Sequence, residues 1–289
     1  MCQKDRFIPD FRRHYIRPAP AERVLEALKR AGKDPQRLRP EDLAPIDEFH
    51  TMGRAATLEL GRIAGITEST TVLDVGCGIG GPARCLAATY GCHVTGVDLL
   101  EDYCDTADIL TRLTGLSHLI EFRQADALDL PFPDAAYGVV WSQHAAMNIQ
   151  DKGRLYREMH RVLKRDGTLA IFDVLSNPAT PPGPIHFPVP WAQSPEMSFL
   201  ISPEELRGLL AASGFSIENW VDCTDAALEI FAKLVLKVGQ NGLPPLGTHV
   251  LLGPGFESML ANQLQNFREK RIVVVQVVAK KVAAPESCG

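Results

Sequence analysis

The sequence predicts a doubly wound α/β fold with a seven-stranded, mostly parallel sheet and helical cap elements. Three observations predict it. Strands alternate with amphipathic helices from residue 71 to residue 174, a glycine-rich turn follows the first strand, and the 289-residue chain is 45% hydrophobic. A chain this long and this apolar buries a large core, which excludes intrinsic disorder. One large domain with appended segments is therefore expected.

Two helices are expected before the sheet begins. Residues 21–31 place three aliphatic side chains on one helical face and end at Gly32, a residue type that commonly ends helices. A second helix is expected across residues 51–64. We expect residues 1–50 to form a helical cap or lid, which would bring Tyr15 over the bound ligands as a substrate-binding residue.

Seven strands are expected, and helices separate the first five of them. The strands span residues 71–75, 93–98, 120–124, 137–142, 168–174, 215–221 and 271–280. The fourth is almost wholly apolar, as a strand buried on both faces of a sheet should be. The last strand follows a helical excursion and is expected to insert as an antiparallel neighbour. Residues 51–222 and 271–281 would then form the core.

The segments after the fifth strand break the alternation. Residues 178–195 contain seven prolines and are expected to form an ordered loop, because proline removes backbone donors and fixes φ. Ser202 and Glu205 have the spacing of a capping box, which predicts that a helix begins there. Residues 223–270 carry two amphipathic helices and form a helical insertion. This insertion either caps a pocket or provides the face of a homodimer.

Charge and composition narrow the classes of partner. The formal net charge of −5 disfavours a polyanion, so no nucleic-acid partner is expected. No apolar run approaches the ~18–20 residues of a membrane helix, and the N-terminus lacks a hydrophobic signal segment. We therefore expect no membrane insertion and a cytoplasmic location. The seven cysteines form no CxxC pair, which predicts reduced thiols and no metal site.

A glycine-rich turn, DVGCGIGG at residues 74–81, lies between the first strand and the next helix. Gly76 and Gly78 allow a tight turn and a close approach of the backbone to a ligand, and the helix N-terminus adds a favourable dipole. Together with Gly81 they also match G-x-G-x-x-G, which is a weak indication on its own. A dinucleotide site is therefore an alternative at this point.

Three acidic residues at successive strand ends favour a different ligand. Asp74 precedes the glycines, where it would oppose a pyrophosphate and suit a cationic ammonium group. Asp98 ends the second strand and can accept hydrogen bonds from both hydroxyls of a ribose. Asp126 follows the third strand and can accept one from an exocyclic amine such as adenine N6. An amino-acid end, a ribose and an adenine describe S-adenosylmethionine.

The motifs together resemble the class I S-adenosylmethionine-dependent methyltransferases, which have a Rossmann-like fold. The resemblance is carried by VLDVGCGIGG (72–81), GVD (96–98), DALDLPF (126–132), VWSQ (140–143) and RVLKRDG (161–167). It covers about residues 50–220. The subgroup that looks most similar holds the ubiquinone/menaquinone C-methyltransferases and the sarcosine/dimethylglycine N-methyltransferases. This chain departs from the subgroup at Arg165-Asp166, a surface turn where the subgroup usually has Pro-Gly, and at Asn148 and His144, where it often has other residues. Because of the departures at 144 and 148, the resemblance does not identify the acceptor.

The resemblance implies a cofactor, S-adenosyl-L-methionine, and a set of residues that bind it. These are Asp74, Gly76, Gly78, Asp98, Leu99, Asp126, Ala127 and Gln143. Methyl transfer to a small molecule would then be an in-line displacement in which the protein mainly positions the reactants. Few catalytic residues need to be visible for such a reaction.

Candidate residues for the acceptor side lie next to the sheet edge that holds the cofactor. His144 is the first candidate for a general base, because its ordinary pKa near 6.5 suits proton transfer at neutral pH. His50 is a second candidate, and Asn148 could orient a polar acceptor. Substrate contacts are expected from Tyr15 and Asp47, and from His186 and Trp191 in the proline-rich loop. Aromatic walls favour either an apolar acceptor or an amine bound by cation–π contact.

Three other functions remain alternatives on the sequence. An NAD-dependent oxidoreductase would share the glycines and Asp98, although Asp74 argues against it. A catalytically silent S-adenosylmethionine-binding protein would keep the same acidic set. A nucleic-acid methyltransferase would need a basic rim that the net charge does not indicate.

Overall fold

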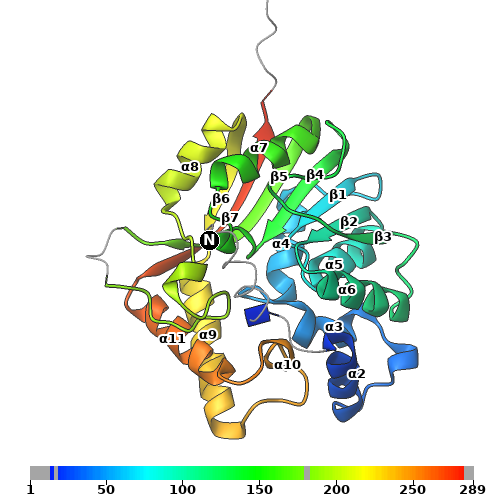
Figure 1. Cartoon of the computed structure of the whole chain (residues 1–289), viewed down its shortest axis with the longest axis vertical. Coiled ribbons are helices and arrows are strands. Elements are labelled where there is room, and N and C mark those ends of the chain that lie inside the picture. The colour runs from blue at the N-terminus through cyan, green and yellow to red at the C-terminus, as the bar shows by residue number, and fades with distance from the viewer. Residues whose placement is uncertain (1–13, 16–18, 179–182, 283–289) are drawn as a thin grey trace, which may run out of the picture.

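The computed structural model describes residues 14–15, 19–178 and 183–282. Its centre is one seven-stranded sheet in the order β3-β2-β1-β4-β5-β7-β6 (Figure 1). The strands are β1 (Thr71–Val75), β2 (His93–Asp98), β3 (Ile120–Gln124), β4 (Tyr137–Gln143), β5 (Leu163–Ser176), β6 (Phe215–Asp222) and β7 (Ile272–Lys281). The pairs among β1 to β5 are parallel, and β7 pairs antiparallel with both β5 and β6. The predicted fold class and the antiparallel insertion of the last strand are confirmed.

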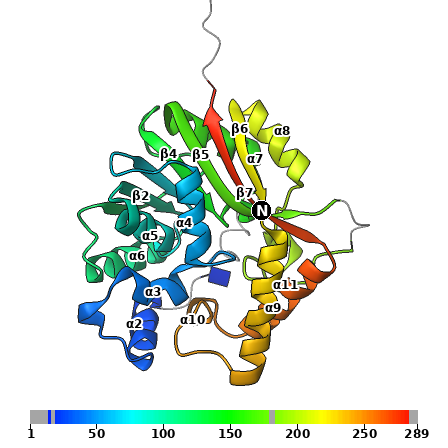
Figure 2. The same ribbon diagram turned by 180° about the vertical axis from the view of Figure 1, so that it is seen from behind.

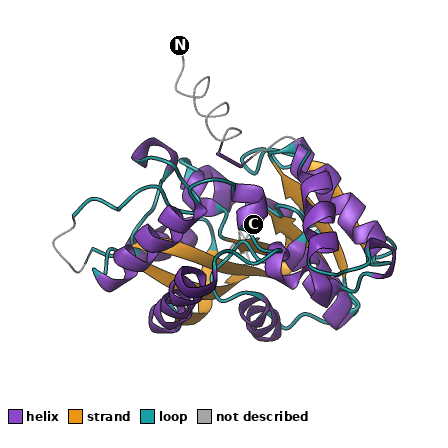
Figure 3. Cartoon of the chain, turned by 90° about the horizontal axis from the view of Figure 1, so that it is seen from below, coloured by secondary structure: helices purple, strands orange, loops and turns teal. Residues whose placement is uncertain are grey.

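Helices cover both faces of the sheet (Figure 3). They are α2 (Pro20–Arg30), α3 (Pro40–Asp47), α4 (Arg54–Ile63), α5 (Gly81–Tyr90), α6 (Glu101–Leu113), α7 (Lys152–Val162), α8 (Pro203–Ala212), α9 (Thr224–Asn241), α10 (His249–Leu252) and α11 (Phe256–Arg268). Side chains of α4, α5, α9 and α11 share one apolar core with one face of the sheet, and those of α7 and α8 share a second core with the other face. Figure 1 shows α7 and α8 in front of the sheet, and Figure 2 shows α4 in front when the molecule is seen from behind.

Helices from distant parts of the chain gather at one end of the sheet. Figure 1 shows α2, α3 and α9–α11 beyond the end toward which the parallel strands run. A third apolar core joins α2 to α6 and to the segment around α10, with Leu28, Leu110 and Leu251 among its buried residues. The N-terminal helices and the segment of α9–α11 therefore meet over the edge where a doubly wound sheet binds ligands.

Several element boundaries differ from the sequence prediction for identifiable reasons. The helix expected from residue 51 begins at Arg54, because Met52 and Gly53 have φ of +70° and +59°, which no helix contains. Strand β5 begins five residues earlier than predicted, at Leu163. Its first part contains a register shift against β4, and Asp166 there has φ of +59°. Aspartate tolerates this left-handed conformation better than most residues.

Other predictions about the chain have mixed outcomes. The capping box is confirmed, since Ser202 Oγ accepts from the amide of Glu205 and Glu205 Oε2 accepts from the amide of Ser202. Helix α3 was not predicted. The five cysteines within the described residues are unbridged thiols. Over that same part of the chain, no helix combines the length and the apolar character that crossing a bilayer requires.

Candidate functional site

A cavity of about 1750 Å³ opens at the carboxyl ends of β1, β2 and β4. The volume exceeds the ~300–1000 Å³ typical of a pocket for one small ligand, so it has room for two. The glycine turn and the segments after β2, β3 and β4 form one end of it. Residues 44–53 form another wall, and the segment 230–263 closes the far end. The site is thus assembled from nearly the whole length of the chain.

The glycine turn is shaped by close packing on one side and by open space on the other. Gly76 has φ of +81°, and a Cβ added there would lie 2.3 Å from the Cβ of Ala145. Gly78 has φ of +54°, and an added Cβ would meet no protein atom within 4 Å. Both glycines line the cavity. The turn therefore needs glycine at 76 for packing and presents bare backbone at 78 to a ligand.

Asp74 lies beneath this turn, with 1% of its surface exposed. Its Oδ2 atom is buried and has no hydrogen-bond partner. Burial, together with the nearby carboxylates of Asp98 and Glu48, raises the pKa of Asp74 to about 8. An unpaired buried carboxyl oxygen is costly, and a cationic group placed next to it would remove the cost.

Asp98 at the end of β2 links the glycine turn to the next helix. Its Oδ2 accepts from the amide of Gly78 at 2.9 Å and its Oδ1 accepts from the amide of Leu100 at 3.0 Å. Burial raises the pKa of Asp98, and these backbone donors oppose the rise. Each oxygen keeps a second lone pair for a ligand hydroxyl, and both Asp98 and Leu99 line the cavity.

Asp126 and Ala127 follow β3 and line the same end of the cavity. Asp126 is exposed, and its Oδ1 caps the turn by accepting from the amide of Leu128 at 2.9 Å. The structure places seven of the eight residues predicted to bind the cofactor on the cavity wall. Asp74, the eighth, is buried in β1 two residues before Gly76 and is not among the lining residues.

Gln143 at the end of β4 supplies a second unpaired polar atom. Its Oε1 accepts from Trp141 Nε1 at 3.0 Å and from the hydroxyl of Thr57 at 3.3 Å, which fixes the carboxamide orientation. Its Nε2 is buried and has no hydrogen-bond partner. A donor at Gln143 and an acceptor at Asp74, on adjacent strands, match the carboxylate and ammonium groups of an amino acid.

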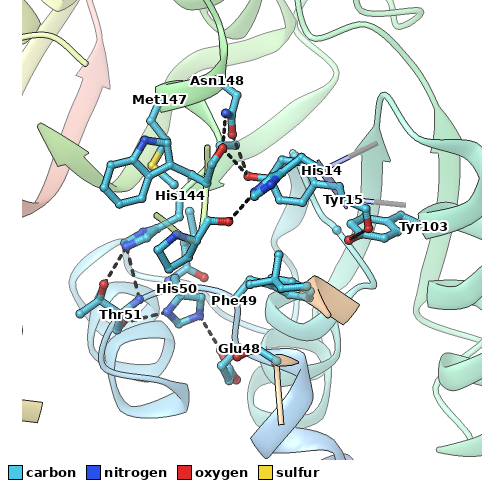
Figure 4. A pocket seen from close by; sticks show the side chains of 18 of the residues that line it. His14, Tyr15, Glu48, Phe49, His50, Thr51, Tyr103, His144, Met147 and Asn148 are labelled. Atoms are coloured by element: carbon cyan, nitrogen blue, oxygen red, sulfur yellow. Dashed lines mark hydrogen bonds and ion pairs between the residues drawn. The ribbon is translucent and has the colours of Figure 1, made fainter. Parts of the chain in front are cut away.

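His144 is held in one tautomer by its neighbours (Figure 4). Its Nδ1 lies 3.1 Å from the carbonyl of Phe172 and must donate to it. Its Nε2 accepts from the amide of Thr51 at 3.3 Å and lies 3.0 Å from the Thr51 hydroxyl. Burial, followed by the neighbouring His50, lowers the pKa of His144 to about 3. Both ring nitrogens are thus engaged and the ring is neutral, an arrangement that suits positioning better than proton transfer.

His50 and Glu48 form a buried pair on the same wall (Figure 4). His50 Nε2 lies 2.5 Å from Glu48 Oε2, and His50 Nδ1 lies 3.1 Å from the carbonyl of Thr51. The hydroxyl of Thr57 lies 3.0 Å from His50 Nε2. Both side chains line the cavity. A carboxylate and an imidazole in contact can take up and share a proton.

Tyr15, Asn148 and Trp191 meet on the opposite wall (Figure 4 labels the first two). The hydroxyl of Tyr15 donates to Asn148 Oδ1 at 2.9 Å, and Asn148 Nδ2 donates to the carbonyls of Trp191 and Met197 at 2.7 and 3.0 Å. The carboxamide of Asn148 therefore ties the N-terminal segment to the loop after β4 and to the proline-rich loop. All three residues line the cavity.

Two of the predicted substrate-binding residues have other partners. Asp47 borders the cavity, but its carboxylate forms a two-point ion pair with Arg84, at 2.5 and 3.1 Å. His186 lies outside the residues that line the cavity and pairs with Glu269 at 2.9 Å. The structure therefore does not bring His186 to the site.

Glu48, Thr51 and Gln263 are among the polar residues of the cavity wall that the sequence analysis did not predict. Glu48 and Thr51 flank the predicted His50, but no spacing pattern marks them. Gln263 lies on α11, 120 residues from Gln143, so only the fold brings these two side chains to one cavity.

Comparison with known proteins identifies the central part of the chain. Residues 73–171 match a family model described as "Methyltransferase domain". A glycine/sarcosine/dimethylglycine N-methyltransferase of Actinopolyspora halophila is 40% identical over 137 residues, which are 47% of this chain and 23% of that protein. A phosphoethanolamine N-methyltransferase of Zea mays is 31% identical over 192 residues, 66% of this chain and 37% of that protein. The chain thus spans less than half the length of these relatives.

Solved structures match the fold over a longer stretch. Geranyl diphosphate C-methyltransferase from Streptomyces coelicolor A3(2), in a complex with S-adenosyl-L-homocysteine, has a TM-score of 0.69 at 19% identity. The match covers 97% of this chain and 98% of that one. The [4+2]-cyclase SpnF also has a TM-score of 0.69, at 22% identity, over 98% of this chain and 97% of that one. At these identities the likeness shows the fold alone.

Proposed function

The chain contains a class I S-adenosylmethionine-dependent methyltransferase domain, and we propose that it transfers the methyl group of S-adenosylmethionine to a small-molecule acceptor. S-adenosylmethionine is the cofactor of this family. One observation carries the proposal: the unpaired Oδ2 of Asp74 lies beneath a glycine turn that opens onto the cavity. A dinucleotide pyrophosphate has no donor for that oxygen and would oppose ionisation of Asp74, whereas the ammonium group of an amino acid would donate to the carboxylate and favour its charged form.

The acidic residues at three strand ends would hold the three parts of the cofactor. Asp74 would pair with the ammonium group, and Gln143 Nε2 would donate to the carboxylate next to it. Asp98 would accept from the ribose hydroxyls, for which each of its oxygens keeps a lone pair. Asp126 would accept from the adenine amine, and Leu99 and Ala127, which line the same cavity, would contact the adenine.

The chain's own contribution to the reaction would be alignment and exclusion of water. When bound, S-adenosylmethionine supplies a methyl group on a positively charged sulfur that is already activated for displacement. Holding an acceptor in line with that methyl group is worth up to ~7–11 kcal/mol of the barrier. Asn148 would keep Trp191 and Met197 in place on the acceptor side, because its carboxamide donates to the backbone carbonyls of both. We propose Asn148 and His144 as positioning residues.

Glu48 and His50 are the groups that we propose to take up a proton from an acceptor that must lose one. They lie on the cavity wall in direct contact with each other. In this pair, the carboxylate of Glu48 would accept the proton. His144 is less suited to this role, because its Nε2 lone pair already accepts from Thr51. A general base of this kind is worth about 10²–10⁴ in rate.

We also propose a division of the chain that follows from the cavity. Residues 51–222 and 271–281 would form the core, residues 1–50 a cap or lid, and residues 223–270 an insertion that closes the acceptor end. Side chains of α9, α10 and α11 line the cavity within one chain, which favours a cap over a homodimer face.

Two measurements on the purified chain test the proposal. Calorimetric titration is expected to show binding of S-adenosylhomocysteine and none of NADH. Incubation with methyl-labelled S-adenosylmethionine and a fractionated metabolite extract is then expected to label a small molecule. Binding of NADH and not of S-adenosylhomocysteine would overturn the proposal. Binding of S-adenosylhomocysteine without any labelled product would favour a cofactor-binding protein that does not methylate.

A matched pair of variants tests the cofactor site. Asp98→Ala is expected to weaken S-adenosylhomocysteine binding about 5- to 150-fold, the range for ribose donors left unpaired. Asp105→Ala removes an exposed carboxylate from the neighbouring helix α6 and is expected to bind as the wild type does. Equal affinities in the two variants would remove Asp98 from the site.

A further inference from the structure

The far end of the cavity is formed by the helical insertion, and its wall is almost wholly apolar. Six side chains from α9, α10 and α11 are typical of it: Phe231, Leu234, Val238, Leu252, Phe256 and Leu260. Five of these six are less than 10% exposed, and Leu234 is partly buried. We call this end of the cavity the acceptor chamber. Its wall gives a bound molecule hydrocarbon contacts and excludes water.

The charged side chains of the cavity lie elsewhere and have one sign. Among the described residues that line it, every formally charged side chain is acidic: Asp47, Glu48, Asp98, Asp126, Asp151 and Glu196. The part of the wall contributed by α9–α11 carries none of them. An ion of either sign would lose its hydration against the apolar wall, where no opposite charge pairs with it, and an anion would also be repelled by the carboxylates elsewhere in the cavity. The chamber therefore favours an uncharged molecule.

Gln263 and Asn266 are the buried polar residues of α11, and of these two only Gln263 lines the cavity. It lies on α11 among the residues that line the chamber, and only 2% of its surface is exposed. Its Oε1 atom is buried and has no hydrogen-bond partner. Leaving a buried carbonyl oxygen unpaired costs about 1–3 kcal/mol, so buried groups of this kind are normally satisfied. The missing partner is a hydrogen-bond donor.

We propose that the acceptor is an uncharged, hydrocarbon-rich molecule whose hydroxyl group donates a hydrogen bond to Oε1 of Gln263. The proposal rests on the proposed function, because it assigns this chamber to the acceptor. Gln263 would be a specificity-determining residue: the apolar wall holds the hydrocarbon part, and the carboxamide selects a molecule with a donor. A site of this kind rejects an analogue that lacks the donor, because the buried carbonyl is then left unpaired.

A probe pair that differs only in the donor tests the proposal. The full chain, saturated with S-adenosylhomocysteine, is titrated calorimetrically with 4-hexylphenol and with its methyl ether, 4-hexylanisole. The wild type is expected to bind the phenol at least about fivefold more tightly than the ether. In Gln263→Leu this preference is expected to fall to near unity, while the ether still binds. Gln263→Glu keeps an acceptor oxygen at the position and is expected to keep the preference.

Gln240→Leu provides the matched control, since it makes the same replacement at an exposed position on α9. It should preserve the preference of the wild type. Equal binding of the two probes by the wild type would overturn the proposal and would indicate that water satisfies Gln263. Failure of both probes to bind would overturn the apolar assignment of the chamber. Failure of S-adenosylhomocysteine to bind in the same cell would instead contradict the proposed function.

Discussion

The environment of the Asp74 carboxyl group indicates which kind of ligand group it would bind. The chain positions it beneath a glycine turn, gives its Oδ2 no partner and raises its pKa to about 8. At pH 7 the free protein therefore carries a protonated Asp74. An ammonium group beside it would favour the charged carboxylate and lower that pKa again. Cofactor binding and loss of the proton are thereby coupled.

We expect S-adenosylhomocysteine binding at pH 7 to release about one proton, and the affinity to rise as the pH increases toward 8. Calorimetric titrations in phosphate and in Tris, which differ in ionisation enthalpy, measure the proton count directly. Asp74→Asn should bind about 10- to 150-fold more weakly and release no proton. The exposed-site variant Asp105→Asn should behave as the wild type. Proton release that persists in Asp74→Asn would assign the titrating group elsewhere.

His144 gives a second prediction, on stability. Its pKa in the folded protein is lowered to about 3 from an ordinary 6.5, so below pH 6.5 the unfolded chain binds a proton that the folded chain does not. The stabilising contribution is full above pH 6.5 and is lost as the pH falls toward 3. Between pH 7.5 and 5 the loss should be about 1–2 kcal/mol.

Urea unfolding at the two pH values measures that loss. His144→Gln should lose less stability than the wild type over this range, because glutamine does not titrate. His93→Gln, which replaces an exposed histidine on β2, should keep the pH dependence of the wild type. If the free energy of unfolding of His144→Gln fell as steeply between pH 7.5 and pH 5 as that of the wild type, another group would be responsible for the pH dependence.

A buried lysine side chain helps to fix the loop after β4. Lys152 at the start of α7 is 6% exposed, and its Nζ donates to the carbonyls of Ala146, Ile149 and Phe199. Burial lowers the pKa of Lys152 to about 8. The three hydrogen bonds join the short helix that carries Asn148 (Ala146–Asn148) to the segment after the proline-rich loop. These hydrogen bonds therefore help to position the residues on the acceptor side of the cavity.

Lys152→Met is expected to destabilise the protein by about 2–4 kcal/mol, because three carbonyls lose their donor. The control, Lys164→Met, replaces an exposed lysine and should change the free energy of unfolding by no more than about 0.5 kcal/mol. Urea unfolding at pH 7 measures both. A Lys152 variant as stable as the wild type would mean that water replaces the ammonium group.

Elements also differ in how far the sequence predicts them. Strands β1, β2 and β3 begin and end as predicted, because apolar runs with a turn at each end leave little choice of register. Helix α3 was missed, since Pro45 lies inside it and removes a helical hydrogen bond. Tertiary packing stabilises it nonetheless, with Leu43 and Ile46 fully buried. Local propensity could not show that.

The two ends of the candidate site also differ in how far the sequence predicts their residues. Its cofactor end uses residues at the carboxyl ends of consecutive strands, and sequence order alone places such residues together. The acceptor end combines residues 48–51, 144–148 and 230–263, which only the three-dimensional packing brings to one cavity. Glu48 and Gln263 carry no motif, so no pattern in the sequence could have selected them.

A buried ion pair links the N-terminal part of the chain to the helix that follows the glycine turn. Arg84 on α5 is fully buried and donates to both oxygens of Asp47, the last residue of α3. A Cβ atom added at Gly81 would lie only 2.1 Å from the backbone carbonyl oxygen of Asp47. The helix that follows the cofactor turn and the segment that forms one cavity wall are therefore packed against each other without a gap.

Breaking this pair from one side should be costly. Asp47→Ala leaves the Arg84 guanidinium buried with two unpaired donors, and we expect a loss of about 3–5 kcal/mol in the free energy of unfolding. The double variant Asp47→Leu/Arg84→Met removes both charges and should recover most of that loss, because the desolvation penalty disappears together with the attraction. Urea unfolding of the single and double variants measures the coupling. If Asp47 instead served mainly to contact the acceptor, Asp47→Ala would leave stability within about 0.5 kcal/mol of the wild type and weaken acceptor binding alone.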